Sequence, residues 1–493
     1  MDLGLERVSR LLENLRPSSE QDLATSSSSS PIPAPHRAFP LIHVAGTNGK
    51  GSVCAYIASA LQASGLRVGR YNSPHLVTPR DTIQINNTPI AETDFNHVQA
   101  WVAQQDAELG LESTSFERLT AAAFYWFAYG PRPDLGSQGS TGYRANVDVA
   151  VIEVGVGGRL DATNVVEQPQ VCVITSIGMD HVGLLGNTIG EVVFEKAGII
   201  KQGVPVVVAP QSSSEADKVY QVIEEKAHSV GLNVSSPNSQ LTKVQAAHWI
   251  DHPSSSSEVL LDLDPGRVGH WAALTRPINQ SLFEFWIPLL GDFQLENAAT
   301  AIAALQVLRA EPTTGDGADQ WRQQITDDTI RQGIASTVWP GRLQWIEADA
   351  APSEVRGRLL VDGAHNPAAA IALKAYVDSQ VSSSPSSSRK RTHWIMAFTK
   401  GKDIEEMFDI LFTPPTSLPA VEPDTFTAVE FSPPEGMPWV SSIPTDEVCR
   451  RLQVQQERFY SDVCFLRFNF LGSPFKCRFA MTQMAMTAVN GGK

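Results

Sequence analysis

The 493-residue sequence contains no uninterrupted apolar run near the roughly 20 residues that a membrane helix needs. Its five cysteines are scattered and form no Cys-x-x-Cys pair, which argues against a zinc knuckle and against a disulfide framework. Positive charge is also scarce, because 38 lysines and arginines stand against 53 acidic residues, for a net charge of -15. A chain this acidic is poorly suited to bind nucleic acid. We therefore expect a protein with no membrane span, with reduced thiols and with small-molecule partners.

The N-terminal segment lacks the features of a targeting signal. Its apolar residues are spaced as in a helix, but it carries Asp2, Glu6 and Glu13, which neither a transit peptide nor a secretory signal favours. We expect a cytoplasmic protein and leave a mitochondrial pool open. The acidic composition and the short insertions described next are compatible with a monomer.

Segments rich in serine or in glycine, serine and proline interrupt the chain. Such segments cannot bury enough apolar surface to offset the entropy lost on ordering. We expect surface insertions at residues 26–30, 131–142, 254–257 and 382–388.

Between these segments, short β-branched runs alternate with helical patterns, as is typical of a parallel sheet covered on both faces. Strands are expected at residues 41–44, 147–154, 171–176, 204–208 and 359–361, and helices at residues 52–64 and 296–308. The pattern predicts an α/β protein. A further strand is expected after a Pro-Gly break, and we place a domain boundary at residues 335–342. Residues 1–338 would form the larger domain and residues 339–493 a smaller one.

A glycine-rich loop follows the first expected strand and opens the first expected helix. In that arrangement backbone N–H groups and the helix dipole surround a phosphate, Lys50 adds a positive charge, and Ser52 can reach a magnesium ion. The spacing is unusual, since Val44 replaces the first glycine of a common phosphate loop and Gly51 separates lysine from serine. A glycine turn without a ligand is the alternative. The predicted nucleotide-binding residues are Gly46, Thr47, Asn48, Gly49, Lys50, Gly51 and Ser52.

Residues 43–52, His-Val-Ala-Gly-Thr-Asn-Gly-Lys-Gly-Ser, resemble the nucleotide loop of the folylpolyglutamate synthase and dihydrofolate synthase family, relatives of the Mur ligases. Further segments resemble the family in the same order, at residues 73–76, 152–164, 180–181 and 195–198. The resemblance implies a Mur-ligase-type ATP-binding domain with a mostly parallel sheet, followed by a smaller Rossmann-like α/β domain.

The resemblance also implies that magnesium binds Ser73, Glu153 and His181. Magnesium prefers oxygen ligands, so a hydroxyl and a carboxylate at a strand end suit it. A surface acid is the alternative interpretation of Glu153. Imidazole is softer than the ion prefers, so His181 taken alone is as well explained as an ordinary loop histidine.

Lys196 matches a family lysine that carbon dioxide converts to a carbamate, which implies a further anionic oxygen ligand near the metal. A structural lysine is the alternative. Lys50, Lys196 and His181 are the residues that the resemblance places in catalysis.

Residues from later in the chain match the other half of the family's ATP site. An arginine can neutralise phosphate charge, and an aspartate at a strand end can accept hydrogen bonds from ribose. The resemblance assigns ATP contacts to Asn297, Arg342 and Asp362, with His365 as a neighbour that a packing role at a helix start explains equally well. ATP would then bind between the two domains.

These parts imply acyl-phosphate chemistry, in which a substrate carboxylate attacks ATP and the amino group of L-glutamate then displaces phosphate. Asn48 and the likeness of residues 3–7 to fungal dihydrofolate synthases favour dihydropteroate as the acceptor. Because bacterial bifunctional members share Asn48, a folylpolyglutamate synthase acting on folates and a bifunctional enzyme are the alternatives. Phe116 could stack on a pterin or belong to the core.

The resemblance covers roughly residues 2–450, after which the sequence departs from the family pattern. A mispredicted exon could produce such an ending, and loss of a final strand would expose a sheet edge. An inactive nucleotide-binding protein is therefore an alternative from another class. A simple phosphate-loop kinase or GTPase would not explain the later motifs together.

Overall fold

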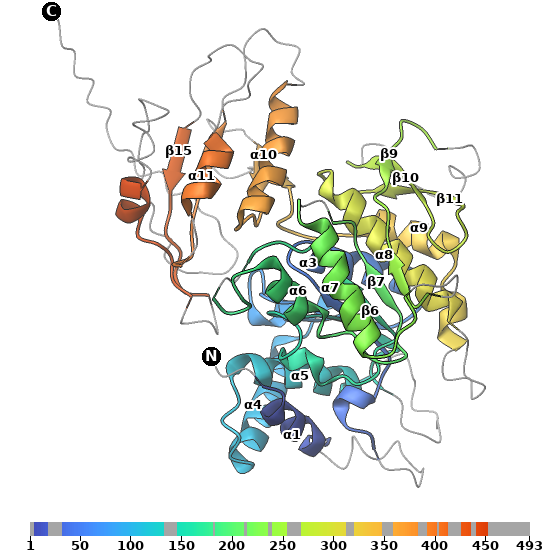
Figure 1. Ribbon diagram of the computed structural model, residues 1–493. Helices are drawn as coiled ribbons and strands as arrows, with labels where there is room; N and C mark the ends of the chain where they lie inside the picture. Colours follow the sequence, from blue (N-terminus) through green and yellow to red (C-terminus); the bar gives the residue numbers. More distant parts are fainter. Residues whose placement is uncertain are drawn as a thin grey trace, which may run out of the picture.

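A computed structural model describes residues 4–17, 32–132, 145–180, 183–211, 214–234, 239–253, 268–311, 320–347, 358–382, 392–401, 404–412, 425–434 and 440–451 (Figure 1). His181, the residues after 451 and most of the four predicted insertions lie outside these described residues. Within these ranges, none of the helices has the length and the apolarity that a membrane crossing would require.

An eight-stranded sheet forms the centre of the larger part of the molecule. In spatial order its strands are β4 (Thr88–Pro89), β3 (Ile83–Ile85), β2 (Val68–Tyr71), β5 (Val149–Glu153), β1 (Leu41–Ala45), β6 (Val171–Ile174), β7 (Val206–Val208) and β8 (Leu241–Lys243). All pairings from β2 to β8 are parallel, while β3 and β4 add an antiparallel edge. Because β1 lies between β5 and β6, the loop that follows β1 sits in the middle of the carboxyl edge of the sheet.

Helices cover both faces of this sheet, as Figure 1 shows. One face packs against α3 (Lys50–Ala63) and α8 (Phe293–Ala310), with α9 (Asp327–Ser336) outside α3. A three-stranded antiparallel sheet joins the same core through β9 (His248–Trp249), β10 (His270–Thr275) and β11 (Leu282–Ile287). The opposite face packs against α1 (Glu6–Asn14), α4 (Glu92–Glu108), α5 (Ser115–Tyr129), α6 (Ile189–Ala197) and α7 (Ala216–Ser229).

The central strands form where the sequence supplies apolar residues without alternation. Every residue of β1, β5 and β6 is buried, because helices cover both sides of these strands. The helix starts are specified locally: the hydroxyl of Thr114 accepts a hydrogen bond from the backbone N–H of Glu117, whose carboxylate accepts one in return, and α5 begins there.

The strands predicted at residues 41–44, 147–154, 171–176 and 204–208 are confirmed as β1, β5, β6 and β7. The two predicted helices are confirmed as α3 and α8, each starting two or three residues earlier than expected. The sequence did not predict β2 or β8. Both strands are short and carry polar residues, such as Arg70 and Lys243, that break a continuous apolar run.

The C-terminal part is smaller and has its own core. In it β12 (Gln344–Glu347) pairs antiparallel with β13 (Arg358–Val361), and β14 (His393–Met396) pairs in parallel with β15 (Thr425–Ala428). Two helices, α10 (Pro367–Ser382) and α11 (Ile404–Phe412), contribute side chains to the same core. The strand predicted at residues 359–361 is confirmed within β13, and the strand expected after the Pro-Gly break is β12. The division of the chain at residue 338 stays a prediction.

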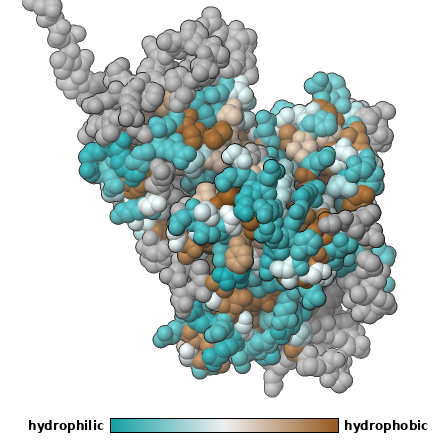
Figure 2. Space-filling model, viewed as in Figure 1, coloured by the Kyte–Doolittle hydropathy of each residue, from teal (hydrophilic) through white to brown (hydrophobic). Residues whose placement is uncertain are grey.

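The surface seen in Figure 2 is largely hydrophilic, with apolar patches among the polar side chains. Exposed large apolar side chains include Phe194 of α6 and Ile371 of α10. Apolar side chains that are exposed singly are normal for a globular protein.

Candidate active site

The predicted phosphate loop connects β1 to α3 and is fixed against the end of β6. The backbone N–H groups of Thr47 and Asn48 donate to the carbonyl of Ser176, at 2.9 and 3.1 Å. Gly46 has φ +147°, and a Cβ there would lie 1.9 Å from the hydroxyl oxygen of Thr175. Only glycine fits this approach, so the residue type at position 46 allows the loop to lie directly against the end of β6.

Lys50, at the start of α3, faces a carboxylate from the neighbouring strand. Its Nζ lies 3.9 Å from Oε1 of Glu153 and donates to the carbonyl of Thr47 at 3.2 Å. Glu153 is the last residue of β5 and is 5% exposed. Burial raises the pKa of this carboxyl, while Lys50 and a hydrogen bond from Asn72 oppose the shift. A buried carboxylate beside one cation, at the edge where α/β sheets bind ligands, is suited to a metal–phosphate complex.

Asn72, which the sequence did not single out, holds the second oxygen of this carboxylate. Its Nδ2 donates to Oε2 of Glu153 at 2.8 Å. The next residue is Ser73, whose backbone N–H also favours the charged form of Glu153 and so lowers its pKa. Asn72 directly precedes the motif at residues 73–76, and this adjacency is the signal that could have revealed it.

The structure brings two of the three predicted magnesium ligands, Ser73 and Glu153, to one place. The third, His181, lies outside the described residues. Among the residues that are described, no cluster of three or more His, Cys, Asp or Glu side chains has a metal-binding arrangement. A hydroxyl and a buried carboxylate are oxygen donors of the kind magnesium prefers, so the residues present fit the ion.

Lys196, on α6, reaches the phosphate loop from the opposite face of the sheet. It is 3% exposed, and its Nζ donates to the carbonyl of Gly46 at 2.8 Å. Burial and the charge of Lys50 lower the pKa of Lys196 to about 7, although Asp180 and Asp161 act in the other direction. A large fraction of this amine is therefore neutral near neutral pH.

Asn297, predicted to contact ATP, lies against the loop from α8. A Cβ on Gly49 would be 2.2 Å from its Oδ1, and Gly49 has φ +87°. The side chain of Asn297 donates to Gln294, whose Nε2 lies 3.5 Å from the hydroxyl oxygen of Ser52. The first turn of α8 therefore packs directly on the phosphate loop.

Arg342 and Asp362, also predicted to contact ATP, lie together at the start of the smaller part of the molecule. Nη1 of Arg342 lies 2.1 Å from where a Cβ on Gly363 would be. Asp362 accepts hydrogen bonds from the backbone N–H groups of Leu343 and Ala364, at 2.9 and 2.8 Å. Arg342 is among the groups that oppose the raising of the Glu153 pKa by burial. Its positive charge therefore acts on Glu153, which lies beside Lys50 of the phosphate loop.

Two side chains after Asp362 connect the smaller part to the phosphate loop and to the end of β6. Nδ2 of Asn366 donates to Oδ1 of Asn48 at 3.0 Å. Nε2 of His365 lies 3.9 Å from a carboxylate oxygen of Asp180, and its Nδ1 lies 2.8 Å from the carbonyl of Gly363. Asn366 was not predicted as a site residue, although it belongs to the same motif as Asp362 and His365.

A series of buried polar side chains supports the second glycine-rich loop, residues 155–158, which follows β5. Nε2 of His43 lies 2.8 Å from the hydroxyl of Thr163, which donates to Asp161 at 2.6 Å. The other oxygen of Asp161 accepts from the backbone N–H of Val156 at 2.9 Å. Burial lowers the pKa of His43 to about 3, so the imidazole is neutral and donates from Nε2.

Phe116, considered as a pterin contact, lies beneath this same loop. A Cβ on Gly155 would be 2.4 Å from its ring, and the ring centroid is 6.4 Å from that of Tyr71. Phe116 is partly buried against the core that includes α1, α4 and α5. Its role in binding a substrate stays a prediction.

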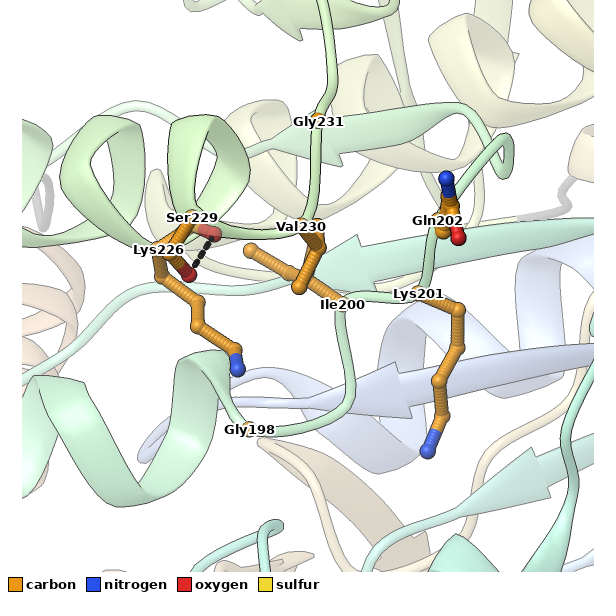
Figure 3. A pocket seen from close by; sticks show the side chains of 8 residues that line it. All are labelled: Gly198, Ile200, Lys201, Gln202, Lys226, Ser229, Val230 and Gly231. Atoms are coloured by element: carbon orange, nitrogen blue, oxygen red, sulfur yellow. Dashed lines mark hydrogen bonds between the residues drawn. The ribbon is translucent and has the colours of Figure 1, made fainter.

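A surface cleft of about 540 Å³ lies away from these residues (Figure 3). Its lining consists of Gly198, Ile200, Lys201, Gln202, Lys226, Ser229, Val230 and Gly231. Residues 198–202 come before β7, and residues 226–231 lie at the end of α7, which leads back to the start of β8. The cleft is therefore at the amino edge of the sheet, opposite the phosphate loop. None of the predicted site residues lines it.

Two domain families match parts of the chain. The dihydrofolate synthetase C-terminal domain matches residues 344–467, and the Mur ligase middle domain matches residues 135–305. The first match continues past residue 450, near which the motif resemblance was expected to stop.

Two fungal proteins are similar over most of their length. The chain is 34% identical over 452 residues to a probable dihydrofolate synthetase of Schizosaccharomyces pombe, which covers 91% of this chain and 87% of the relative. It is 31% identical to the dihydrofolate synthetase of Saccharomyces cerevisiae, over 91% of this chain and 86% of that protein. Among solved structures, Mycobacterium tuberculosis folylpolyglutamate synthase complexed with ADP and AMPPCP is similar, with a TM-score of 0.65 and 25% identity. The alignment covers 94% of this chain and 86% of that one.

Proposed function

We propose that this chain, which belongs to the dihydrofolate synthetase family of Mur-ligase-like enzymes, joins L-glutamate to 7,8-dihydropteroate and converts ATP to ADP and phosphate. The observation that carries the proposal is the similarity to two fungal dihydrofolate synthetases over 91% of the chain. The arrangement of Lys50, Glu153 and Arg342 around one phosphate loop supports it. We expect a cytoplasmic monomer.

ATP would lie with its phosphates in the loop at residues 46–52. The first turn of α3 offers backbone N–H groups and the positive end of the helix dipole, and Lys50 supplies a charge beside them. Asn297 would approach from α8. Asp362 would face the ribose, and Arg342 the phosphates, from the smaller part of the molecule.

Ser73 and Glu153, with His181, would hold magnesium. The bound ion supplies charge neutralisation for the phosphate oxygens. Asn72 keeps one oxygen of Glu153 fixed by hydrogen bonding, which leaves the oxygen nearer to Lys50 directed towards the loop. Ser73 closely follows β2 and Glu153 ends β5, so strands of the central sheet anchor these two ligands.

Lys196 would contribute after modification. Its neutral amine would add to carbon dioxide and lose a proton, forming a carbamate that carries a negative charge. The low pKa of the amine, which arises mainly from burial, supports this proposal because only the neutral form is nucleophilic.

The reaction would proceed in two steps. The carboxylate of dihydropteroate attacks the γ-phosphorus of ATP, and ADP leaves with the electrons of the broken bond. The amino group of glutamate then attacks the acyl phosphate, inorganic phosphate leaves, and the amine loses a proton. Both steps depend on in-line positioning and on charge neutralisation, which Lys50 and Arg342 are placed to provide.

A coupled assay of ADP release with purified protein tests the proposal. We expect ADP release to require dihydropteroate and L-glutamate together. Glutamylation of tetrahydrofolate without turnover of dihydropteroate would favour a folylpolyglutamate synthase, and turnover of both acceptors a bifunctional enzyme. ATP binding without glutamate-dependent ADP release would show an inactive nucleotide-binding protein.

A further inference from the structure

Arg70 is a buried cation that forms no ion pair with the described residues, although the nearby charge of Glu153 favours its charged form and so raises its pKa. It lies on β2 and is 3% exposed. Its Nη2 donates to the side-chain oxygen of Gln84, whereas Nε and Nη1 have no hydrogen-bond partner among the described residues. Burial lowers the pKa of Arg70 to about 10, so the side chain is still charged at neutral pH. A buried charge with so few hydrogen-bond partners is unfavourable for stability. Its presence therefore indicates a role other than stabilising the fold.

Arg70 also lies over the face of an aromatic ring. The guanidinium carbon of Arg70 lies 4.8 Å from the ring centroid of Trp339. Trp339 also contacts the phosphate loop, because a Cβ on Gly51 would lie 2.5 Å from its Cζ2 atom. The indole therefore contacts both Arg70 and the first turn of α3, the turn that carries Lys50.

Arg70 also reaches the segment that carries Ser73. Gln84, which accepts from Arg70, donates through Nε2 to the carbonyl of Asp81 at 2.9 Å. The carboxylate of Asp81 in turn accepts hydrogen bonds from the backbone N–H groups of Val77 and Thr78, at 2.8 and 2.9 Å. A short chain of hydrogen bonds thus connects the guanidinium to the loop after Ser73.

Trp339 begins the segment that leads into the smaller part of the molecule. Arg342 follows three residues later, after Gly341 with φ +73°, and its guanidinium packs against Gly363. The backbone N–H of Gly341 donates to the side chain of Gln344 at 2.9 Å, which limits the freedom of this short segment. A displacement of Trp339 would therefore move Arg342 relative to the phosphate loop.

We propose that Arg70 is a positioning residue for the nucleotide: by holding Trp339 against Gly51, it sets the distance between the phosphate loop and Arg342. The inference rests on the proposed function only in taking ATP as the nucleotide. Arg70 does not touch the phosphates. It acts through the indole of Trp339. Through its hydrogen bond to Gln84, Arg70 also links the loop that carries Ser73 to the phosphate loop.

Titration calorimetry with AMPPCP and magnesium tests the proposal on the full-length protein. We expect Arg70→Met, which keeps an unbranched apolar side chain on the indole, to weaken AMPPCP binding about tenfold or more, the order expected for a desolvated cation–π contact. Trp339→Leu should weaken it similarly. The double variant should lose little more than either single variant, because both remove one contact. Arg70→Lys should restore part of the affinity.

Arg331→Met is the matched control. Arg331 also packs its guanidinium on an aromatic ring, 4.5 Å from the centroid of Phe283, but between α9 and β11 and not against the phosphate loop. We expect it to lower the melting temperature and leave AMPPCP affinity unchanged. If Arg70→Met behaves like this control, or if the effects of Arg70→Met and Trp339→Leu on affinity simply add, the proposal is wrong.

Further variants and a turnover assay distinguish a folding defect, or a failure of the proposed function, from a failure of the proposal about Arg70. Should Arg70→Met fail to fold, Arg70→Lys and Trp339→Phe provide the same comparison with smaller changes. In turnover assays the KM for ATP should rise in Arg70→Met while the KM for glutamate stays within about twofold, because the contacts of Arg70 lead to the phosphate loop and to the loop after Ser73, which the proposed function assigns to the nucleotide and its metal. If the wild-type protein binds AMPPCP but makes no dihydrofolate, the proposed function fails and the binding comparison still tests Arg70.

Discussion

The ammonium group of Lys196 donates a hydrogen bond to the carbonyl of Gly46 at 2.8 Å, although 150 positions separate the two residues. This contact places the lysine beside the phosphate loop and out of solvent. Burial, assisted by the charge of Lys50, lowers its pKa to about 7. The position explains how one lysine can be protonated or neutral within the physiological pH range.

Carbamate formation on Lys196 is the first prediction. Protein equilibrated with ¹³C-bicarbonate should show a carbamate carbon resonance that Lys196→Ala lacks. Removing the group should lower kcat about 10- to 100-fold, the range typical of losing a residue that supports a metal site. Lys196→Glu, which places a carboxylate nearby, should recover part of the activity. An unaltered kcat in Lys196→Ala would leave the lysine with a structural role.

The lowered pKa of Lys196 predicts that the free energy of unfolding depends on pH in buffer free of carbon dioxide. The ordinary pKa of 10.5 applies to the unfolded chain, and about 7 to the folded one. Between these values the unfolded state binds more protons, so the free energy of unfolding should rise with pH across that window. Lys196→Met removes the titrating group, and its gain in stability over the wild type should shrink as pH rises from 7 to 10. Parallel curves for the two proteins in urea unfolding would contradict the assignment.

Glu153→Gln should separate stability from activity. Burial raises the pKa of Glu153, so the folded state binds more protons than the unfolded state above pH 4.5, and the wild type should lose stability there as pH rises. Glutamine lacks this effect and can still contact Asn72. We expect the variant to melt at a higher temperature at pH 7 in the absence of nucleotide, while the magnesium requirement for turnover increases about 10- to 100-fold. Thermal melts and magnesium titrations of the initial rate check the two halves.

Asn366→Ser tests the contact between the smaller part and the phosphate loop. Asn366 donates to Asn48 and also accepts from the backbone N–H of Ala369 at 2.9 Å, at the start of α10. Serine can keep the helix-capping hydrogen bond but is too short for Asn48. The KM for ATP should rise about 2- to 10-fold, as expected for one hydrogen bond, with the melting temperature little changed. Asn366→Ala, which loses both contacts, should also melt earlier.

The centre of the fold could be predicted from the sequence because its strands are continuous apolar runs. β1, β5, β6 and β7 consist almost entirely of buried aliphatic residues, and that signal does not depend on distant contacts. β2 gave no such signal, since Gly69 and Arg70 interrupt it. It forms because β5 and β3 pair with it on either side.

The candidate site was predictable as far as its residues lie in motifs. Lys50 was predicted from the phosphate-loop pattern, and Glu153, Asn297 and Arg342 from the family resemblance. The structure places all four around one loop. The supporting contacts were not predictable, because they join segments far apart in sequence. Arg70 and Trp339 are 269 positions apart, and no local pattern shows that their side chains stack.

The series of buried polar side chains that supports the second glycine-rich loop yields the last prediction. Thr163 accepts from His43 and donates to Asp161, so replacing it by valine removes both contacts at nearly constant volume. His43 and Asp161 would then each be buried with a missing partner, which should lower the free energy of unfolding by about 1–3 kcal/mol. Thr163→Ser keeps the hydroxyl and should lose less than half as much. Because Asp161 also holds the N–H of Val156, the loop after Glu153 should loosen, and amide hydrogen exchange of Val156 should accelerate in Thr163→Val but not in Thr163→Ser. Equal exchange rates in the two variants would show that the loop is held by its packing on Phe116 instead.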